Sequence, residues 1–156
     1  MLSPPSSHIT TTRVVVRPND MDADRNVNNA VYFDYFYQAR LEHLRRLGVY
    51  DAENPLYANL LALAENTCRY LAPAYYGDVL ILWTATHAVG TSSFQLVYHV
   101  WREHDEQLIA LGHSVQVWLG ETKQSTPLPP GIRQALTAAL YPELPKPSDY
   151  QHKSQA

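Results

Sequence analysis

The stretch NDMDADRNVNNAVYF, from Asn19 to Phe33, carries acids and amides whose spacing could support chemistry. Three of its carboxylates alternate along the chain and match the first, third and fifth oxygen ligands of an EF-hand calcium loop: Asp20, Asp22 and Asp24. Such a loop needs glycine at its sixth position and a bidentate glutamate at its twelfth, where this chain has Arg25 and Val31. A β-branched segment also precedes the stretch in place of the incoming helix. The pattern therefore argues against a calcium loop.

Two other interpretations of this stretch remain open from the residues alone. Asparagine and aspartate are good helix N-caps, and a carboxylate near a helix N-terminus gains about 0.3–1 kcal/mol from the helix dipole. Alternatively, the free N–H groups at the helix start could bind a developing oxyanion. A carboxylate a few residues upstream could then act as a general base toward water or as a nucleophile. This second interpretation would supply both halves of a site for thioester hydrolysis.

The flanking segments predict a strand before this stretch and a helix after it. Residues 10–17 are dense in β-branched side chains and are followed by Pro18, which favours a strand. Residues 30–48 place apolar side chains close to helical spacing and end at Gly48. The first half of this helix is apolar or aromatic almost all round, so we expect other structure to wrap it. His43, in its charged second half, is expected at the surface.

The rest of the chain predicts a run of antiparallel strands. After Pro55 we expect a short helical piece and then a strand to about Leu71. Three clearer strand patterns and a small terminal helix follow, at residues 79–87, 92–103, 108–120 and 129–140. This order indicates the α+β class, with one sheet packed on one long helix. We expect a single domain over residues 10–142, between flexible tails at 1–9 and 143–156 that are rich in proline, serine and polar residues.

The composition narrows the classes of function. Of 156 residues, 46% are hydrophobic and 17% charged, and the formal net charge is -3, so the chain has no basic field for nucleic acid or acidic membranes. No segment approaches the roughly 20 apolar residues that span a bilayer, and the first residues lack the features of a signal peptide. The lone Cys68 cannot form an internal disulfide, which fits a reducing compartment. We therefore expect a cytoplasmic protein that binds neither nucleic acid nor membranes.

The segment DMDADRNVNNAVYFDYFYQAR closely resembles the signature of hotdog-fold thioesterases of the 4-hydroxybenzoyl-CoA thioesterase type. That signature is roughly Asp-x-Asp-x-x-Gly-His-Val-Asn-Asn, followed by an aromatic-rich helix with Ala-Arg near its middle. Two later segments, AENTCRYLAPAYYGDVLIL and LPPGIRQAL, are similar to further landmarks of the same family. The resemblance extends from about Thr11 to Leu136, which is nearly all of the expected domain.

This resemblance implies a hotdog domain, in which a curved antiparallel sheet of about five strands wraps one long central helix. It implies a thioesterase that acts on acyl-CoA or acyl-carrier-protein thioesters without a metal or cofactor, as a homodimer or a dimer of dimers with the active site at the interface. Asp22 falls on the catalytic aspartate, and Asn29 would present its backbone N–H to the thioester carbonyl, with Asn28 beside it. The residues considered for substrate binding are Arg25, Asn26, Tyr32 and Glu65, with a structural or supporting role favoured for Glu65.

The chain departs from the family pattern at Arg25 and Asn26, which replace the usual Gly-His pair. A non-glycine residue resists a positive φ, and the histidine would have been a possible proton shuttle. This departure motivates one alternative to hydrolysis, an acyl-CoA-binding protein without hydrolase activity. A hydratase or dehydratase is a further, less favoured alternative, because that chemistry usually needs a histidine with the carboxylate and this chain has Asn26 at the natural histidine position. Arg25 could instead pair with a nearby aspartate or meet a substrate phosphate or carboxylate. Tyr75 and Tyr76 could line an acyl or aryl pocket, although core or interface positions explain them more simply.

Overall fold

The computed structural model describes residues 2–50, 53 and 61–151. Within these ranges the chain forms five β-strands, two α-helices and two short 3-10 helices. The strands are β1 (Thr10–Val15), β2 (Leu61–Tyr70), β3 (Val79–Val89), β4 (Ser93–Arg102) and β5 (Gln107–Trp118). The helices are η1 (Pro18–Asp20), α1 (Val31–Arg46), α3 (Pro130–Ala138) and η2 (Pro147–Asp149). No helix in these ranges is long and apolar enough to cross a membrane.

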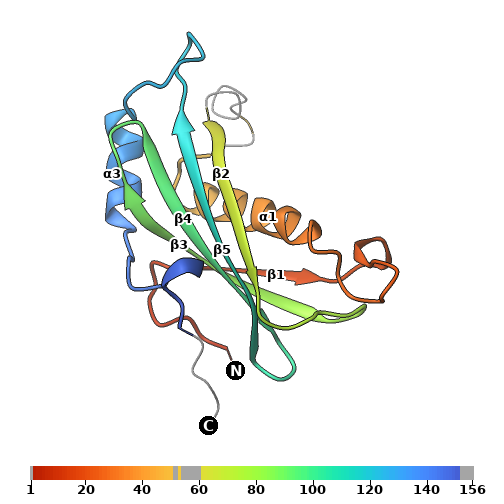
Figure 1. Cartoon of the computed structure of the whole chain (residues 1–156). Coiled ribbons are helices and arrows are strands. Elements are labelled where there is room, and N and C mark those ends of the chain that lie inside the picture. The colour runs from red at the N-terminus through yellow and green to blue at the C-terminus, as the bar shows by residue number, and fades with distance from the viewer. Residues whose placement is uncertain (1, 51–52, 54–60, 152–156) are drawn as a thin grey trace.

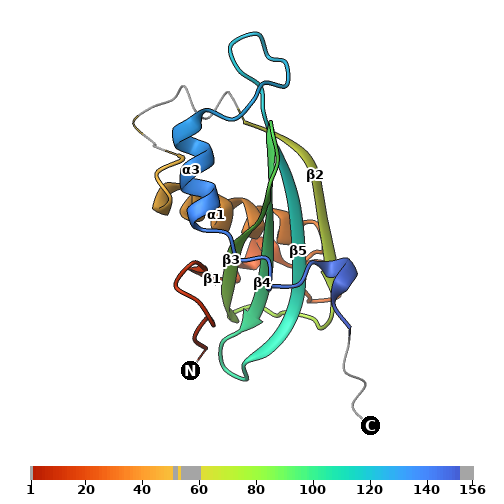
Figure 2. The same ribbon diagram turned by 90° about the vertical axis from the view of Figure 1, so that its left-hand side faces the viewer.

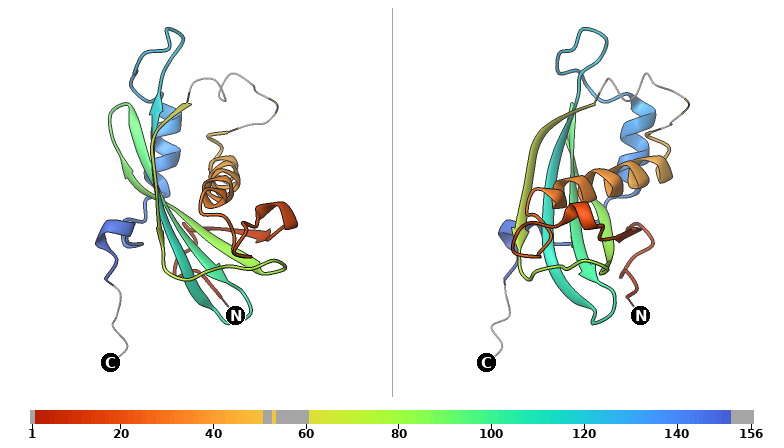
Figure 3. Two further views of the ribbon diagram at one scale, coloured as in Figure 1. Left: turned by 45° about the vertical axis from the view of Figure 1, so that its right-hand side comes forward. Right: turned by 90° about the vertical axis from the view of Figure 1, so that its right-hand side faces the viewer.

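The five strands form one antiparallel sheet in the order β1-β3-β4-β5-β2 (Figure 1). The predicted strands and both predicted helices are therefore present, with bounds shifted by a few residues. The helical piece expected after Pro55 lies outside the described residues. Register shifts within three strand pairs bend the sheet, because a bulge increases local twist and curvature. The curved sheet wraps α1 on its concave side (Figure 3).

The first half of α1 is buried against the sheet, as its aromatic composition predicts. Tyr35, Phe36 and Ala39 are each at most 1% exposed, and the Phe36 ring stacks on Tyr98 of β4 with centroids 4.7 Å apart. Gly112 of β5 makes this close approach possible, since a Cβ atom there would lie 2.5 Å from the Phe36 ring. The helix is thus held at a fixed height over the sheet, which fixes the position of its N-terminus.

The second half of α1 is anchored by polar contacts and by α3. Ile132 and Leu136 of α3 share the main core with Leu44 of α1 (Figure 2). His43, which the sequence placed at the surface, is fully buried and bonded to the hydroxyls of Thr10 and Thr86. The expectation was wrong because β1 and β3, distant in sequence, bring matching hydroxyls to both ring nitrogens.

A few residues of the two segments that were expected to be tails pack against the domain. Ile9 is 3% exposed and Leu144 is 5% exposed, and both belong to an apolar cluster on the opposite face of the sheet from α1. Figure 3 shows η2 on that opposite face. Arg69 of β2 donates hydrogen bonds to the carbonyl oxygens of Pro147 and Tyr150, at 3.1 and 2.9 Å. A few apolar anchors and carbonyl acceptors hold these segments despite their polar composition.

Candidate active site

The loop between β1 and α1 closes on itself at the end of α1 farthest from α3 (Figure 1). An isolated antiparallel bridge joins Met21 to Val27, and the Asp22 N–H donates to the Asn26 carbonyl at 2.9 Å. Arg25 adopts a left-handed backbone with φ 65°, at the position where the family pattern has glycine. The loop therefore keeps the turn that glycine would favour, at a conformational cost of about 1–2 kcal/mol for a non-glycine residue.

The first acid of the Asp-x-Asp pair, Asp20, is the anchor of this loop. Its side chain is 2% exposed and accepts hydrogen bonds from the Arg17 backbone, the Arg17 guanidinium and the Tyr35 hydroxyl, at 2.9, 3.0 and 2.9 Å. Burial works to raise the pKa of the Asp20 carboxyl, but these hydrogen bonds outweigh it and hold this pKa below its ordinary value. Asp20 is thus an ionised group with its acceptor sites occupied, suited to holding the loop and not to proton transfer.

The second acid, Asp22, has a different environment two residues away. It is exposed, and its Oδ1 atom accepts the backbone N–H groups of Asp24 and Asn26 at 2.9 and 3.2 Å. Among the described residues, Oδ2 has no hydrogen-bond donor. The loop therefore fixes one carboxylate oxygen and leaves the other open to solvent. An open carboxylate oxygen can accept a proton or attack an electrophile.

Asp22 lines a surface cleft together with neighbours in its own loop and two tyrosines from one other segment. The cleft is bordered by Pro18, Met21, Arg25, Tyr75 and Tyr76. The two tyrosines are 47% and 65% exposed, so they are not core residues. A turn closed by the Tyr75 N–H and the Asp78 carboxylate, 2.9 Å apart, presents them. The apolar wall that they form beside Asp22 could contact an acyl or aryl group.

The start of α1 supplies the second half of the predicted site. Asn28 accepts the Ala30 N–H on its Oδ1 at 3.0 Å, which closes an Asx turn directly before α1. No described residue accepts a hydrogen bond from the Asn29 N–H. The Asn29 carbonyl accepts the Tyr70 hydroxyl at 2.6 Å, which ties the helix start to β2. Tyr70 was not singled out in the sequence, since 41 residues separate it from Asn29 and no local pattern links them.

The remaining predicted binding residues fall in three different places. Asn26 acts through its backbone, which bonds to Asp22 in both directions. Arg25 borders the cleft, and in the described part of the chain it forms no ion pair with either nearby aspartate. Tyr32 is 2% exposed and packs against Tyr70 with ring centroids 5.2 Å apart, so it lies in the core. Glu65 borders a separate hollow and is not brought to Asp22 within one chain.

Comparison with known proteins identifies the family. The model of the thioesterase-like superfamily matches residues 16–136. A chloroplastic acyl-acyl carrier protein thioesterase of Arabidopsis thaliana is 25% identical over 118 residues, which is 76% of this chain and 62% of that protein. The chain therefore spans about three fifths of the length of the first curated relatives it matches, at 62% and 63%.

Solved structures agree with this assignment. A thioesterase of Thermus thermophilus complexed with coenzyme A and Zn is 30% identical and superposes with a TM-score of 0.72, over 85% of this chain and 94% of that chain. A gentisyl-coenzyme A thioesterase is 25% identical with a TM-score of 0.72, over 82% of this chain and 99% of that chain. Together with the curved sheet around α1, these similarities confirm the predicted hotdog fold. The chain belongs to the thioesterase-like superfamily.

Proposed function

We propose that this protein hydrolyses an acyl thioester to a free acid and a thiol, with Asp22 as the reacting carboxylate. The observation that carries the proposal is that the two oxygens of the Asp22 carboxylate differ. Oδ1 accepts two loop N–H groups, and Oδ2 has no described donor and faces a cleft beside Tyr75 and Tyr76. Membership of the thioesterase-like superfamily supports thioester chemistry, as do the names of its relatives.

The chemistry follows from these groups in one of two ways. As a general base, Asp22 takes a proton from the water that attacks the thioester carbonyl carbon. As a nucleophile, it attacks that carbon itself and forms an anhydride, which water then hydrolyses. In both cases the carbonyl oxygen gains negative charge, which the Asn29 N–H would stabilise. The C–S bond then breaks, and the thiolate leaves and is protonated.

The substrate class follows from the relatives and from the cleft. Their names include both coenzyme A and acyl carrier protein thioesters, and we propose a thioester of one of these carriers. Arg25, exposed beside Asp22, is suited to a carrier phosphate or a substrate carboxylate. We propose that the site is completed at the interface of a homodimer, because the edge strand β2 carries Tyr70 to the helix start and leaves its other side unpaired in the described sheet.

The test is thiol release from a panel of acyl-CoA, aryl-CoA and acyl-carrier-protein thioesters by the wild type and by Asp22→Asn. Hydrolysis that the variant loses supports the proposal, and the preferred thioester identifies the substrate class. Thioester binding without thiol release by the wild type would contradict hydrolysis and favour a binding protein. Equal hydrolysis by both proteins would overturn the role of Asp22.

A further inference from the structure

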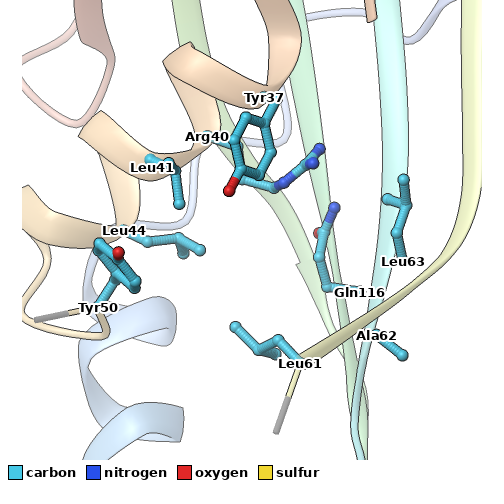
Figure 4. Close-up of a pocket in the computed structure, with 9 residues that line it drawn as sticks. All are labelled: Tyr37, Arg40, Leu41, Leu44, Tyr50, Leu61, Ala62, Leu63 and Gln116. Atoms are coloured by element: carbon cyan, nitrogen blue, oxygen red, sulfur yellow. The ribbon is translucent and has the colours of Figure 1, made fainter. Parts of the chain in front are cut away.

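A second cavity lies between the latter part of α1 and the start of β2 (Figure 4). Its volume is about 190 Å³, and most of its lining is apolar, including Leu41, Leu44 and Leu61. Two polar side chains, Arg40 and Gln116, enter it from α1 and β5. Arg40 lies nine residues after Val31, the start of α1, or about 13 Å along the helix axis at the usual rise per residue. The described lining of this cavity shares no residue with that of the cleft at Asp22, so the two are separate.

Arg40 is a buried charge without a counter-ion in the described structure. Its side chain is 8% exposed, and a guanidinium remains protonated in proteins. Its one acceptor among the described residues is the Tyr98 hydroxyl, at 3.3 Å from Nη1, and no carboxylate there forms an ion pair with it. The guanidinium also lies over the Tyr37 ring, with Cζ 5.4 Å from the ring centre, and most of its five N–H donors have no acceptor among the described residues. Buried charges are normally paired, so the Arg40 guanidinium lacks the anionic partner that such a group usually has.

Gln116 is the second incomplete group. It is 2% exposed, its Nε2 donates to the Ser114 hydroxyl at 2.5 Å, and its Oε1 has no hydrogen-bond partner in the described part of the chain. The guanidinium of Arg40 can only donate, so the Tyr98 hydroxyl accepts from it and donates its own proton to Ser114, 2.7 Å away.

The amide of Gln116 can present either of its ends to the cavity. A half-turn about its last side-chain bond exchanges oxygen and nitrogen in the same space. After that turn the Ser114 hydroxyl donates to Oε1, and the two amide N–H groups become available to a ligand. Figure 4 shows the guanidinium of Arg40 directed toward this amide across the cavity.

From these groups we infer that the cavity binds a carboxylate carried on a small apolar body. Arg40 supplies a pair of parallel donors that match a carboxylate, and the turned Gln116 amide supplies another. A dry cavity of about 150 Å³ holds benzene, so the present volume suits an aryl ring or a chain of about six carbons. The carboxylate belongs either to a free acid or to the distal end of an acyl group. The inference does not depend on the function proposed for Asp22.

The first arm of the test measures binding of free acids. Hexanoate and benzoate are titrated into the wild type and into Asp22→Asn, with hexanamide as the uncharged probe, and heat is followed by calorimetry. If free acids are the ligand, both proteins bind the acids, and Arg40→Met weakens binding at least tenfold. The matched control Arg45→Met removes an exposed charge from the same helix and leaves binding unchanged.

The second arm measures binding of adipyl-CoA and hexanoyl-CoA by calorimetry on the Asp22→Asn protein, so that it is independent of hydrolysis. If a distal carboxylate is the ligand, the protein with Arg40 binds adipyl-CoA more tightly than hexanoyl-CoA. Arg40→Met should then weaken the binding of adipyl-CoA at least tenfold and leave the binding of hexanoyl-CoA unchanged. Loss of a buried charge that lacks a counter-ion should leave the fold intact or stabilise it. Gln116→Leu provides a second variant that should weaken the same ligand. The inference is wrong if neither arm shows a carboxylate-dependent ligand that these variants weaken.

Discussion

The two ends of α1 differ in how their polar groups are satisfied. At the N-terminal end, Asp22 has an open carboxylate oxygen and the Asn29 N–H has no described acceptor. Toward the C-terminal end, both ring nitrogens of the buried His43 are bonded, to the hydroxyls of Thr10 and Thr86 at 2.7 and 2.9 Å. The polar groups at the two ends of α1 are therefore suited to two different roles. Under the function proposed for Asp22, the open groups take part in chemistry at one end, and the hydrogen-bonded groups stabilise the fold at the other.

The largest expected effect is on turnover at the N-terminal end. Asp22→Asn keeps the size of the side chain and an oxygen that can accept the two loop N–H groups, but it removes the reacting carboxylate. We expect thiol release to fall roughly 10²–10⁴-fold, since that is the typical contribution of a general base. Unfolding in urea should change by less than about 0.5 kcal/mol, as for an exposed side chain. Asp24→Asn, at an exposed carboxylate two residues further on, should retain its rate.

The next effect is on stability at the other end of the helix. His43→Phe fills the same space but leaves the hydroxyls of Thr10 and Thr86 without the imidazole, which should cost about 2–4 kcal/mol in the free energy of unfolding. Urea denaturation measures this change. Thiol release per folded molecule should stay near the wild-type rate. A rate loss as large as that of Asp22→Asn would contradict the assignment of different roles to the two ends of α1.

The same end of the helix should make the protein sensitive to acid. Burial, aided by the charge of Arg46, lowers the pKa of His43 to about 4, from 6.5. The unfolded chain therefore takes up a proton that the folded chain resists, and the stabilisation is complete above pH 6.5 and is lost as the pH falls toward 4. The loss by pH 4 is about 3 kcal/mol for this one group. Urea midpoints between pH 7 and 4 measure it, and His43→Phe should flatten that part of the profile.

His99 of β4 should also contribute to the loss of stability between pH 6.5 and 4. Burial lowers its pKa to about 4, against the opposing effect of its hydrogen bond to the Pro145 carbonyl. The His43→Phe profile should therefore retain a slope between pH 6.5 and 4. A completely flat profile would show that burial of His99 has no such effect.

A smaller effect is expected where β2 meets the helix start. Tyr70→Phe removes the hydroxyl that donates to the Asn29 carbonyl, and loss of one such hydrogen bond is worth about 1 kcal/mol. We expect kcat to fall roughly 3- to 10-fold through a less fixed Asn29 N–H. Tyr141→Phe, in the cluster on the far face of the sheet, is the control and should not alter kcat. An unchanged kcat in Tyr70→Phe would show that the Tyr70 hydroxyl does not position the Asn29 N–H for catalysis.

The smallest effect is expected in the loop backbone. Arg25→Gly relieves a positive φ but gives the unfolded chain more freedom, so the two terms oppose each other and the net change should be under about 1 kcal/mol. Urea denaturation measures it. A larger loss of stability would mean that the Arg25 side chain, and not the turn, holds the loop.

The sequence predicts those features that depend on neighbours along the chain. The strands, the wrapped helix and the loop before it follow from periodicity, β-branched content and the placement of proline and glycine, and the structure contains them. The positions of Asp22 and Asn29 rest on a motif within one short segment. The open oxygen of Asp22 and the left-handed turn at Arg25 are consequences of that local geometry.

The features that the sequence did not predict depend on contacts between distant segments. His43 appears polar and exposed until β1 and β3 bring two hydroxyls to it. Tyr70 reaches Asn29 across 41 residues, and Leu144 is buried only because the sheet offers an apolar outer face. In each case a polar or flexible-looking segment is held by a partner that no local pattern specifies.

The division between the two ends of α1 is tested most directly by measuring thiol release and urea unfolding on the same preparations of Asp22→Asn and His43→Phe. We predict that Asp22→Asn loses its rate and keeps its unfolding midpoint, and that His43→Phe loses stability and keeps the rate of its folded molecules. An Asp22→Asn protein that releases thiol at the wild-type rate would contradict the account, as would a His43→Phe protein that is inactive while folded.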